Sequence, residues 1–438
     1  MPLSNLETGG IARCLAQVAD RSRDHVDSFF EVLSETGVSG PSGALESESR
    51  SESGLAVRLL REGRSWLASS DGISPALFSR AVARVARARP SAVAPPPRSL
   101  VGEALRLEDP SELAGFVDAV ELAIKRRHAT FPIEWDLRSH RRHSRVVGAM
   151  LSPEQQEEAY YSCVARTPRS RWGTLLADLE GSTVENVAES LTAVFRGSRA
   201  TPVATARGVD VVLGPAATAV LLHEAVAHAL ETDTLALTGQ PAAAAGVELG
   251  SELLGVLDDP AGAAERVRRS ADDEGMPVVK RWLLRSGVVE QPLADLFVGA
   301  SSSELIPGAA RRGSRHLAPV PRSTHLELLA GSSSLEELVA DCGQGLFVRE
   351  LSRGHLDPLS GELWLDFPYA RRIERGSIGD STGPGRLAGS VAATLAGVRA
   401  VGGDTTFAGA GWCAKGGHRL PVWARAPSVL IGGLDVSP

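Results

Sequence analysis

The chain of 438 residues has few cysteines, few aromatic residues and no long apolar segment. Its four cysteines, Cys14, Cys163, Cys342 and Cys413, lie far apart and include no CxxC pair, so we expect no disulfide framework. No stretch of about 18 apolar residues is present to span a membrane, and the N-terminus has no apolar run suited to a signal peptide. We therefore expect a cytoplasmic protein with no membrane partner.

The chain also has no excess of positive charge. It contains 46 Lys and Arg residues against 53 Asp and Glu residues, for a net charge of −7. This balance favours solubility and argues against a nucleic-acid partner, which would select a basic surface. Hydrophobic residues make up 43% and charged residues 23%, values typical of a soluble globular protein. At this length we expect two domains, because single hydrophobic cores rarely grow so large.

The most informative segment lies in the middle of the chain, at 221–231, and reads LLHEAVAHALE. Two histidines, His223 and His228, lie in an otherwise apolar run, and Glu224 directly follows the first. Burying unpaired imidazoles and a carboxylate costs several kcal/mol, so these side chains need partners. A metal ion can bind the histidines, and the glutamate then faces the water on the metal. This combination is typical of a zinc hydrolase.

The spacing of the two histidines differs from that of the common protease motif, in which they stand at i and i+4 on one helix face. His223 and His228 stand at i and i+5, about 140° apart on a regular helix. Both side chains reach one ion only if the helix is locally widened. A π-type bulge would widen it, and such bulges are frequent at functional sites. From spacing alone, the alternative of two core histidines hydrogen-bonded to the backbone stays open.

Two further segments accompany this motif. Residues 208–215, GVDVVLGP, read as a strand that ends in Gly-Pro, and the proline suits the first turn of a following helix. Residues 411–422 read GWCAKGGHRLPV. Together, the three segments resemble the TldD/PmbA family of metalloproteases. That family pairs a strand and a Gly/Pro turn with an HExxxH helix, and has a late CxKxGQ segment followed by Pro-Val.

The resemblance covers roughly residues 50–90 and 203–438, and little between them. His325 stands where the family usually has Asn, His418 where it usually has Gln, and Ala227 where Gly is frequent. None of these three is an implied metal ligand. The departures therefore bear on the surface that faces the substrate rather than on the metal chemistry.

The resemblance implies a zinc site with three protein ligands, His223, His228 and Cys413, and an open fourth position for water. Glu224 is then the general base that takes the proton of this water. Cys413 is a ligand by resemblance only, because a lone cysteine is usually a small core residue.

Other polar residues near these ligands have alternative roles. Glu231 and Asp233 are rivals of Cys413 as third ligand, but we interpret them as carboxylates that hold a ligand histidine from behind. Lys415 either stabilises an oxyanion or forms a surface salt bridge. The candidates for contact with the substrate are His325, His418 and Lys415.

The expected fold is α+β with two domains. An N-terminal α/β domain covers 1–203, and a C-terminal, mainly β, barrel-like domain with the HExxxH helix covers 204–438. In the first, the sequence predicts one or two helices within 10–36, a hairpin at 55–68, a linker at 90–98, and helices at 75–89, 113–127, 182–196 and from 152 to 161. In the second, it predicts strands at 253–257, 278–284, 325–330, 345–351, 362–367 and 428–434, and helices at 335–340 and 389–401.

A basic cluster lies in the first of these regions and comprises Arg138, His140, Arg141, Arg142, His143 and Arg145. It has two interpretations. The cluster either holds a phosphate or a substrate carboxylate, or it forms an exposed strand or loop whose charges pair with nearby acids. We favour the second.

The sequence supports three functional hypotheses. The first, implied by the resemblance, is a zinc-dependent peptidase that acts on unfolded or modified peptides, including natural-product precursors. The resemblance also implies a dimer, either of two copies or with a TldE/PmbA-like chain. An alternative is a zinc-dependent amide or C–N hydrolase that acts on a small metabolite. A non-catalytic partner subunit is disfavoured, because His223, Glu224, His228 and Cys413 are all present.

Overall fold

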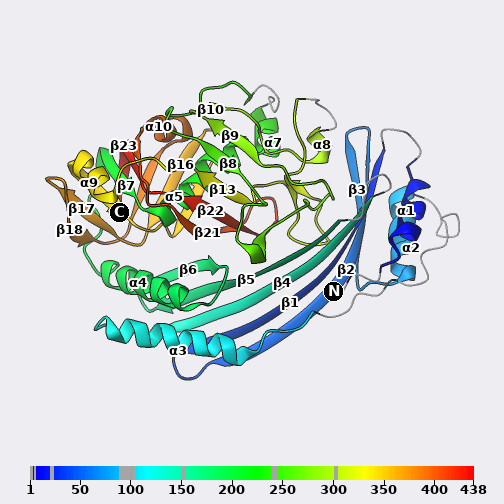
Figure 1. Cartoon of the computed structure of the whole chain (residues 1–438), viewed down its shortest axis with the longest axis horizontal. Coiled ribbons are helices and arrows are strands. Elements are labelled where there is room, and N and C mark those ends of the chain that lie inside the picture. The colour runs from blue at the N-terminus through cyan, green and yellow to red at the C-terminus, as the bar shows by residue number, and fades with distance from the viewer. Residues whose placement is uncertain are drawn as a thin grey trace.

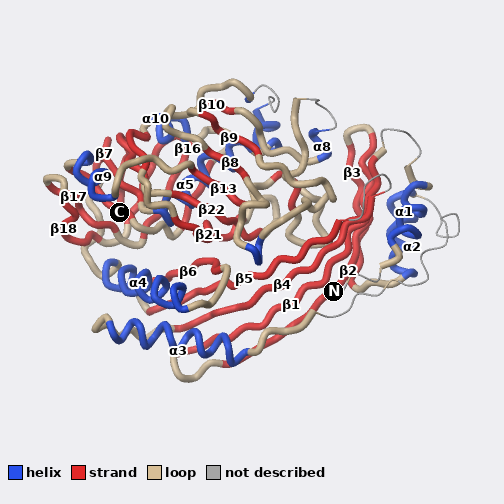
Figure 2. The backbone as a smooth tube through the Cα atoms, in the orientation of Figure 1, coloured by secondary structure: helices blue, strands red, loops and turns tan. Residues whose placement is uncertain are grey.

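A computed structural model describes residues 3, 6–19, 24–87, 100, 105–148, 154–238, 244–299 and 304–438 of the chain. In these residues the fold is α+β, as predicted, with more strand than helix (Figures 1 and 2). The linker predicted at 90–98 lies outside the described residues. Among the described helices, none is both long and apolar enough to cross a membrane.

The N-terminal part of the chain forms one curved sheet with the strand order β3-β2-β1-β4-β5-β6. Its strands are β1 (His25–Pro41), β2 (Glu46–Arg61), β3 (Arg64–Asp71), β4 (Glu134–Gly148), β5 (Glu154–Thr167) and β6 (Ser170–Leu176). Its helices are α1 (Thr8–Ala16), α2 (Pro75–Ala86), α3 (Pro110–Arg126) and α4 (Gly181–Gly197). Figure 1 shows α3 and α4 below this sheet, the C-terminal part above it, and α1 and α2 at one end.

Every strand pair in this N-terminal sheet is antiparallel. The description of this part as α/β is therefore wrong, because that class has parallel strands joined by crossover helices. Tight hairpins are possible only between antiparallel strands. The hairpin predicted at 55–68 is one of them, and it turns at Glu62 and Gly63, whose φ angles are 49° and 68°.

Two of the helix predictions in the N-terminal part are replaced, wholly or in part, by strands. Of the one or two helices predicted within 10–36, one is present as α1, which ends at Ala16, and β1 begins at His25. The helix predicted from 152 to 161 is replaced by β5, which begins at Glu154. Both strands lie inside the sheet and pair on both sides, so backbone pairing overrides the local helical pattern. The other three predicted helices are present as α2, α3 and α4.

The two faces of the N-terminal sheet differ in chemistry. On the face toward α3 and α4, Trp135, Leu137 and Cys163 belong to one apolar cluster with those helices. Arg142 and Glu158, which are direct neighbours across β4 and β5, are out of phase with these apolar positions. The opposite face of the sheet, toward the C-terminal part, is therefore charged.

The basic cluster at 138–145 forms part of β4, and the favoured pairing with acids is confirmed for several members. Arg138 contacts Glu35 at 2.9 Å, and Arg141 contacts Glu108 at 2.6 Å. Arg142 is less well paired, since its acid contacts are 3.4, 3.5 and 3.8 Å long. The strand is not freely exposed, because the C-terminal part covers the face that carries Arg142.

The C-terminal part contains two large sheets. One has the order β10-β9-β8-β13-β22-β21, and its strands are β8 (Val256–Asp258), β9 (Arg281–Arg285), β10 (Val288–Val289), β13 (His325–Leu328), β21 (Thr406–Cys413) and β22 (Leu420–Ala426). The other has the order β15-β16-β19-β23-β7-β14-β17-β18, with β20 also paired to β23. Its strands are β7 (Ala206–Leu213), β14 (Gln344–Val348), β15 (Arg353–Leu356), β16 (Glu362–Phe367), β17 (Ala370–Glu374), β18 (Ser377–Thr382), β19 (Gly385–Ser390), β20 (Val398–Val401) and β23 (Val429–Ser437).

All six strands predicted in this region overlap strands of the structure. Neither sheet closes into a barrel among the described strands, because each keeps two edge strands. The helix α9 (Leu335–Cys342) begins with the predicted capping box of Ser334 and Glu337. The helix predicted at 389–401 is shorter, α10 (Val391–Ala396), because the flanking residues pair in β19 and β20.

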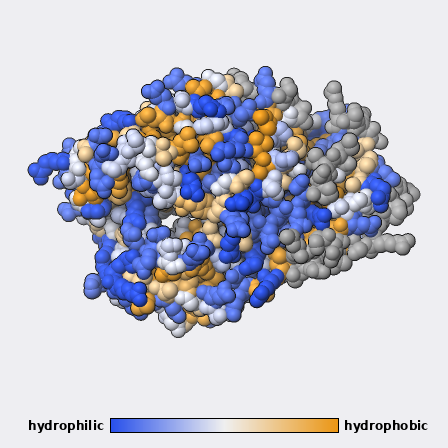
Figure 3. Space-filling view, viewed as in Figure 1, coloured by the Kyte–Doolittle hydropathy of each residue, from blue (hydrophilic) through white to orange (hydrophobic). Residues whose placement is uncertain are grey.

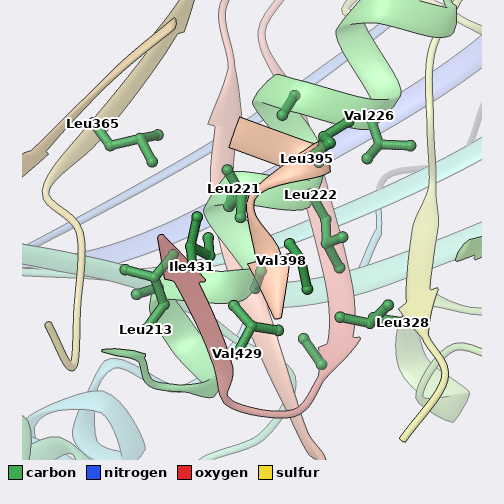
Figure 4. Packing of buried hydrophobic residues seen from close by; sticks show 14 of the residues in the cluster. Leu213, Leu221, Leu222, Val226, Leu328, Leu365, Leu395, Val398, Val429 and Ile431 are labelled. Carbon is green, nitrogen blue, oxygen red and sulfur yellow. The ribbon is translucent and has the colours of Figure 1, made fainter. Parts of the chain in front are cut away.

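The histidine motif lies on a helical segment in the middle of the C-terminal core. This segment consists of α5 (Pro215–Leu221), a π-helix (Leu222–Ala227) and α6 (His228–Leu230), and it follows β7 directly. Figure 4 shows its residues Leu221, Leu222 and Val226 beside Leu328 of β13 and Ile431 of β23. Residues of both sheets thus enclose the helix. Burial stabilises each such side chain by about 1.5–3 kcal/mol, which holds the motif in place.

Buried ion pairs join the N-terminal sheet to the C-terminal part. Arg58 of β2 contacts Asp27 of β1 at 2.6 Å and Glu274 of the C-terminal part at 2.5 Å. The Arg58 guanidinium holds the pKa of Asp27 far below its usual range, against the opposing effect of burial. Arg315 reaches back to Glu31 of β1 at 3.2 Å. These contacts fix the charged face of the sheet against the C-terminal part.

We expect Arg58→Met to lower the free energy of unfolding by about 3–5 kcal/mol, since it leaves the buried carboxylates of Asp27 and Glu274 without their cation. Urea denaturation followed by circular dichroism at pH 7 measures this change. The control is Arg386→Met, which removes an exposed ion pair with Asp366 and should have a much smaller effect. Equal stability losses in the two variants would contradict the role of Arg58.

Candidate metal centre

The π-helical turn at Leu222–Ala227 places the two motif histidines close together. The ring centroids of His223 and His228 are 4.3 Å apart, a separation that a regular helix does not give to residues at i and i+5. The widening predicted from the spacing is therefore present in the structure.

Cys413 reaches these histidines from the end of the edge strand β21. The register of β21 against β22 shifts between Gly409 and Gly411, and Gly411 has a φ angle of 108°, which favours glycine. This bulge changes the direction of the strand just before Cys413. The Cys413 Sγ atom lies 3.6 Å from His228 Nε2, and its side chain is buried.

The three potential ligand atoms of His223, His228 and Cys413 lie within 4.8 Å of one another. Within the part of the chain that the structure describes, no other set of His, Cys, Asp or Glu side chains forms such a group. Two imidazoles and a thiolate are donors that zinc accepts. In a tetrahedral zinc site, nitrogen and sulfur ligands are about 3.6 Å apart, as His228 and Cys413 are.

His223 supplies the strongest sign that this group can hold an ion. Its side chain is 3% exposed, and neither ring nitrogen has a hydrogen-bond partner among the described residues. Burial lowers the pKa of His223 well below its ordinary value, and the neighbouring charge of His228 adds to this. The ring is therefore neutral and can donate a lone pair, which is the form that a metal requires. The residues present fit a zinc ion.

Glu231 holds His228 from the side opposite to Cys413. Its Oε2 lies 2.8 Å from His228 Nδ1, so the Nε2 atom of the ring faces Cys413. Burial opposes a charge on His228, but the Glu231 carboxylate and Cys413 raise its pKa to about 10 in the metal-free chain, so a metal that binds Nε2 would displace a proton from it. The Glu231 carboxylate is buried, and His228, Arg322 and Lys415 lower its pKa to about 2 against the effect of burial. Glu231 is thus placed to orient a ligand rather than to be one.

Asp233 and Lys415 belong to the same ionic cluster. The Lys415 Nζ atom contacts Glu231 at 2.6 Å, Asp233 at 3.2 Å and the Thr234 hydroxyl. Arg322 Nη1 lies 2.8 Å from Asp233. These contacts occupy all three donors of the ammonium group, which favours the salt-bridge interpretation of Lys415 over contact with an oxyanion.

Glu224 lines a cavity of about 260 Å³, here called the Glu224 cavity, which His223 also lines. Burial raises the pKa of the Glu224 carboxyl above its ordinary value, although the charge of His228 opposes this. Gly354 of β15 packs directly against it, since a Cβ atom on Gly354 would lie 2.4 Å from Glu224 Cγ. A carboxylate of raised pKa that lines a cavity beside a metal site is suited to accept and donate protons.

The Glu224 cavity lies between the two parts of the chain. Trp172 and Thr174 of β6 line its N-terminal side, and Arg353 and Trp412 line its C-terminal side. Figure 3 shows that the surface is hollowed where these two parts meet. The importance of Gly354 and Trp172 here was not predicted from the sequence, because their proximity arises from tertiary packing alone.

Besides Lys415, the candidates for contact with the substrate were His325 and His418. Both are buried, and neither is among the described residues that line the Glu224 cavity. The backbone N–H of His325 donates to Asp258, and its ring lies against Phe407. His418 Nδ1 accepts a hydrogen bond from the Gly313 N–H. Burial, together with Arg322 and Arg312, lowers the pKa of His418 to about 4. Both rings fill structural positions in the described chain.

Comparison with known proteins adds independent evidence on the family to which the chain belongs. A family model described as the PmbA/TldA metallopeptidase C-terminal domain matches residues 206–438. The chain is 31% identical over 232 residues to a metalloprotease TldD homolog of Buchnera aphidicola, a match that covers 52% of this chain and 47% of that protein. It is 30% identical over 234 residues to a metalloprotease TldD homolog of Haemophilus influenzae, covering 52% and 48%. The chain thus spans about half the length of the curated relatives it matches.

Solved structures resemble the fold over almost the whole chain. TldE from Thermococcus kodakarensis has a TM-score of 0.73 at 18% identity and covers 98% of this chain and 99% of its own. A crystal structure from Thermotoga maritima has a TM-score of 0.74 at 16% identity, with the same coverage. The N-terminal sheet, which lies outside the family model, therefore belongs to the same fold.

We expect the purified chain to bind one zinc ion and Cys413→Ser to weaken this binding far more than Glu231→Gln. A lost ligand removes a bond to the metal, whereas losing a residue that orients a ligand costs about 10–100-fold in affinity or activity. Competition with a chromophoric chelator measures both affinities. Cys342→Ser, at another buried cysteine, is the control for loss of a thiol. If Glu231→Gln lost zinc while Cys413→Ser retained it, the third ligand would be a carboxylate.

Proposed function

The chain belongs to the PmbA/TldD family of metallopeptidases, and on this premise we propose that it is a zinc-dependent peptidase that acts on unfolded or modified peptides. One observation carries the proposal. The ligand atoms of His223, His228 and Cys413 lie within 4.8 Å of one another, and Glu224 lies beside them in the same cavity as His223. This is the arrangement that hydrolysis of an amide requires.

In the proposed mechanism, each residue has a separate task. When bound, a zinc ion supplies a Lewis acid for the scissile carbonyl and lowers the pKa of water. The Glu224 carboxylate accepts a proton from the attacking water and then donates it to the leaving amine nitrogen. The raised pKa of this carboxyl suits both steps, because the group is a stronger base and retains the proton until the amine leaves. Glu231 keeps Nε2 of His228 turned toward Cys413.

The shape of the site supports a peptide rather than a small metabolite as substrate. A neighbouring cavity of about 370 Å³ shares Trp172, Thr174 and Gly409 with the Glu224 cavity, so the space is elongated. Two edge strands, β6 and β21, flank it. An extended peptide can pair its backbone with an exposed strand edge, which gives affinity without reading side chains. A zinc-dependent amide hydrolase that acts on a small metabolite remains the alternative to be tested.

We also propose a dimer, formed by two copies or with a TldE/PmbA-like chain. The structural likeness to a protein named TldE supports a common architecture for such partners. A role as a non-catalytic subunit is disfavoured, because the metal group and Glu224 are both intact. The cytoplasmic location and the assignment of residues 1–203 and 204–438 to separate domains stay predictions.

We expect Glu224→Gln to keep zinc and the fold while lowering peptide turnover at least about 10²-fold, because only the capacity to accept a proton is lost. Mass spectrometry of unstructured peptides incubated with zinc-loaded wild type and variant measures the change. The control is Glu189→Gln, in an exposed ion pair with Arg349. Unchanged cleavage by Glu224→Gln would refute the general-base role. Cleavage of a small amide but of no peptide would favour the alternative.

The same experiment has a second arm that displaces Glu224 without altering its chemistry. In Gly354→Ala, the new methyl group meets Glu224 Cγ at 2.4 Å, so turnover should fall while zinc is retained. In the matched variant Gly379→Ala, the nearest atom, the Arg372 carbonyl oxygen, is 3.6 Å away, and turnover should not change. Equal activity of the two variants would mean that the position of Glu224 does not limit the reaction.

A further inference from the structure

We propose that a second cavity beside Trp412 binds a carboxylate group of the substrate. This inference rests on the proposed peptidase function and deepens it. The cavity has a volume of about 230 Å³ and is here called the Arg312 cavity. Tyr160 and Trp412 line it together with five arginines, Arg50, Arg141, Arg142, Arg312 and Arg419.

The Arg312 cavity is next to the candidate metal centre. Trp412 lines both this cavity and the Glu224 cavity, and it directly precedes the candidate ligand Cys413. In the register of β21 against β22, Trp412 pairs with Pro421 and Cys413 pairs with Leu420. Pro421 and Leu420 also line the Arg312 cavity. A substrate that extends past Trp412 from Glu224 would therefore reach the Arg312 cavity.

Arg312 is the central group of the proposed subsite. It is fully buried, and its Nε and Nη1 atoms have no hydrogen-bond partner among the described residues. Its Nη2 atom donates to the Asp273 carbonyl at 3.3 Å, and the nearest acid oxygen of its ion pairs, on Asp27, is 3.8 Å away. The guanidinium lies over the ring of Phe29, 4.3 Å from the centroid. A buried guanidinium with two unused donors is costly, and an anion in the cavity would remove this cost.

Arg419 is a second cation without a local acid. No carboxylate of the described residues lies within 4.0 Å of it, and its guanidinium stacks on Trp412, 4.2 Å from the ring centroid. Its side chain is exposed and lines the cavity. Arg142 adds a third cation, whose Nη2 atom has no hydrogen-bond partner among the described residues.

Each acid that lines the Arg312 cavity has at least one cation partner outside it. Glu158 contacts Arg269 at 2.9 Å, and Glu35 contacts Arg138 at 2.9 Å. Glu52 contacts Arg315 at 3.5 Å. Glu35 also contacts Arg50 at 3.3 Å and His140 at 3.1 Å, both of which line the cavity. The five lining arginines still outnumber the three lining acids.

The chemistry of these groups selects a carboxylate. Guanidinium groups bind planar oxyanions through two parallel N–H donors, and such charge-assisted bonds are stronger than neutral ones. A peptide carries a carboxylate at its C-terminus or on an Asp or Glu side chain. The Arg312 cavity would then fix one end of the peptide near the scissile bond, so the enzyme would prefer substrates with an acidic group at that distance.

The test compares three labelled peptides of one sequence: a free C-terminal acid, its C-terminal amide, and an amide with one Glu added near the C-terminus. Fluorescence anisotropy measures their binding to the zinc-loaded, full-length Glu224→Gln variant. We expect one or both acidic peptides to bind at least about tenfold more tightly than the plain amide. Preference for the free acid identifies the peptide C-terminus as the ligand, and equal gain from the Glu peptide identifies a side chain.

Two further variants locate the effect. Arg419→Gln, at an exposed position that folding does not require, should remove most of the preference for acid. Arg312→Lys keeps the positive charge but loses the two parallel N–H donors of the guanidinium group. Once circular dichroism confirms that this variant is folded, its preference for acidic peptides should be reduced. The matched control is Arg285→Gln, whose guanidinium also stacks on a tryptophan, Trp282, at 4.2 Å but lies outside the cavity.

Equal binding of all three peptides overturns the proposal, and so does an acid preference that survives both Arg419→Gln and Arg312→Lys. If wild type cleaves no peptide but the acid preference is present and sensitive to Arg419, the proposed peptidase function fails and the carboxylate subsite stands. If wild type cleaves all three peptides with equal kcat/KM and binds them equally, the peptidase stands and the subsite is refuted.

Discussion

The π-helical turn at Leu222–Ala227 turns His223 and His228 toward the same point, and every other part of the site depends on it. A helix of regular width would separate these side chains by about 140°. The widened turn is held by burial, since its apolar residues belong to one cluster with residues of both C-terminal sheets. The core thus stabilises a backbone form that isolated helices rarely adopt. Cys413 completes the group because a bulge in β21 redirects the strand end.

Charged groups around this turn determine what the histidines can do. Glu231 and Arg322 are buried beside His228, whereas the ring nitrogens of His223 have no hydrogen-bond partner in the described part of the chain and its pKa is lowered. One histidine is therefore oriented by an anion, and the other is ready to donate. The charged face of the N-terminal sheet, fixed through Arg58 and Glu274, forms one wall of the Arg312 cavity.

Most of the candidate site could be predicted from the sequence, but less of the N-terminal fold could. The spacing of His223 and His228 indicated a locally widened helix. The family resemblance added Cys413, which the structure places next to the two histidines. The α3 and α4 helices and the Ser334 cap were predictable from local signals. Strand β5 was not, because its pairing with β4 and β6 outweighs a local helical pattern. Gly354 and Arg312 gain their positions through tertiary contacts with residues far away in the sequence, such as Glu224 and Asp27, for which a single sequence carries no signal.

X-ray absorption at the zinc K-edge of the zinc-loaded chain tests the central claim most directly. The claim is that one ion is held by two imidazoles and one thiolate from His223, His228 and Cys413. It predicts one sulfur ligand at about 2.3 Å and nitrogen or oxygen ligands at about 2.0–2.1 Å, with the sulfur contribution absent in Cys413→Ser. A shell of nitrogen and oxygen alone in the wild-type chain would contradict the account and leave Cys413 as a core residue.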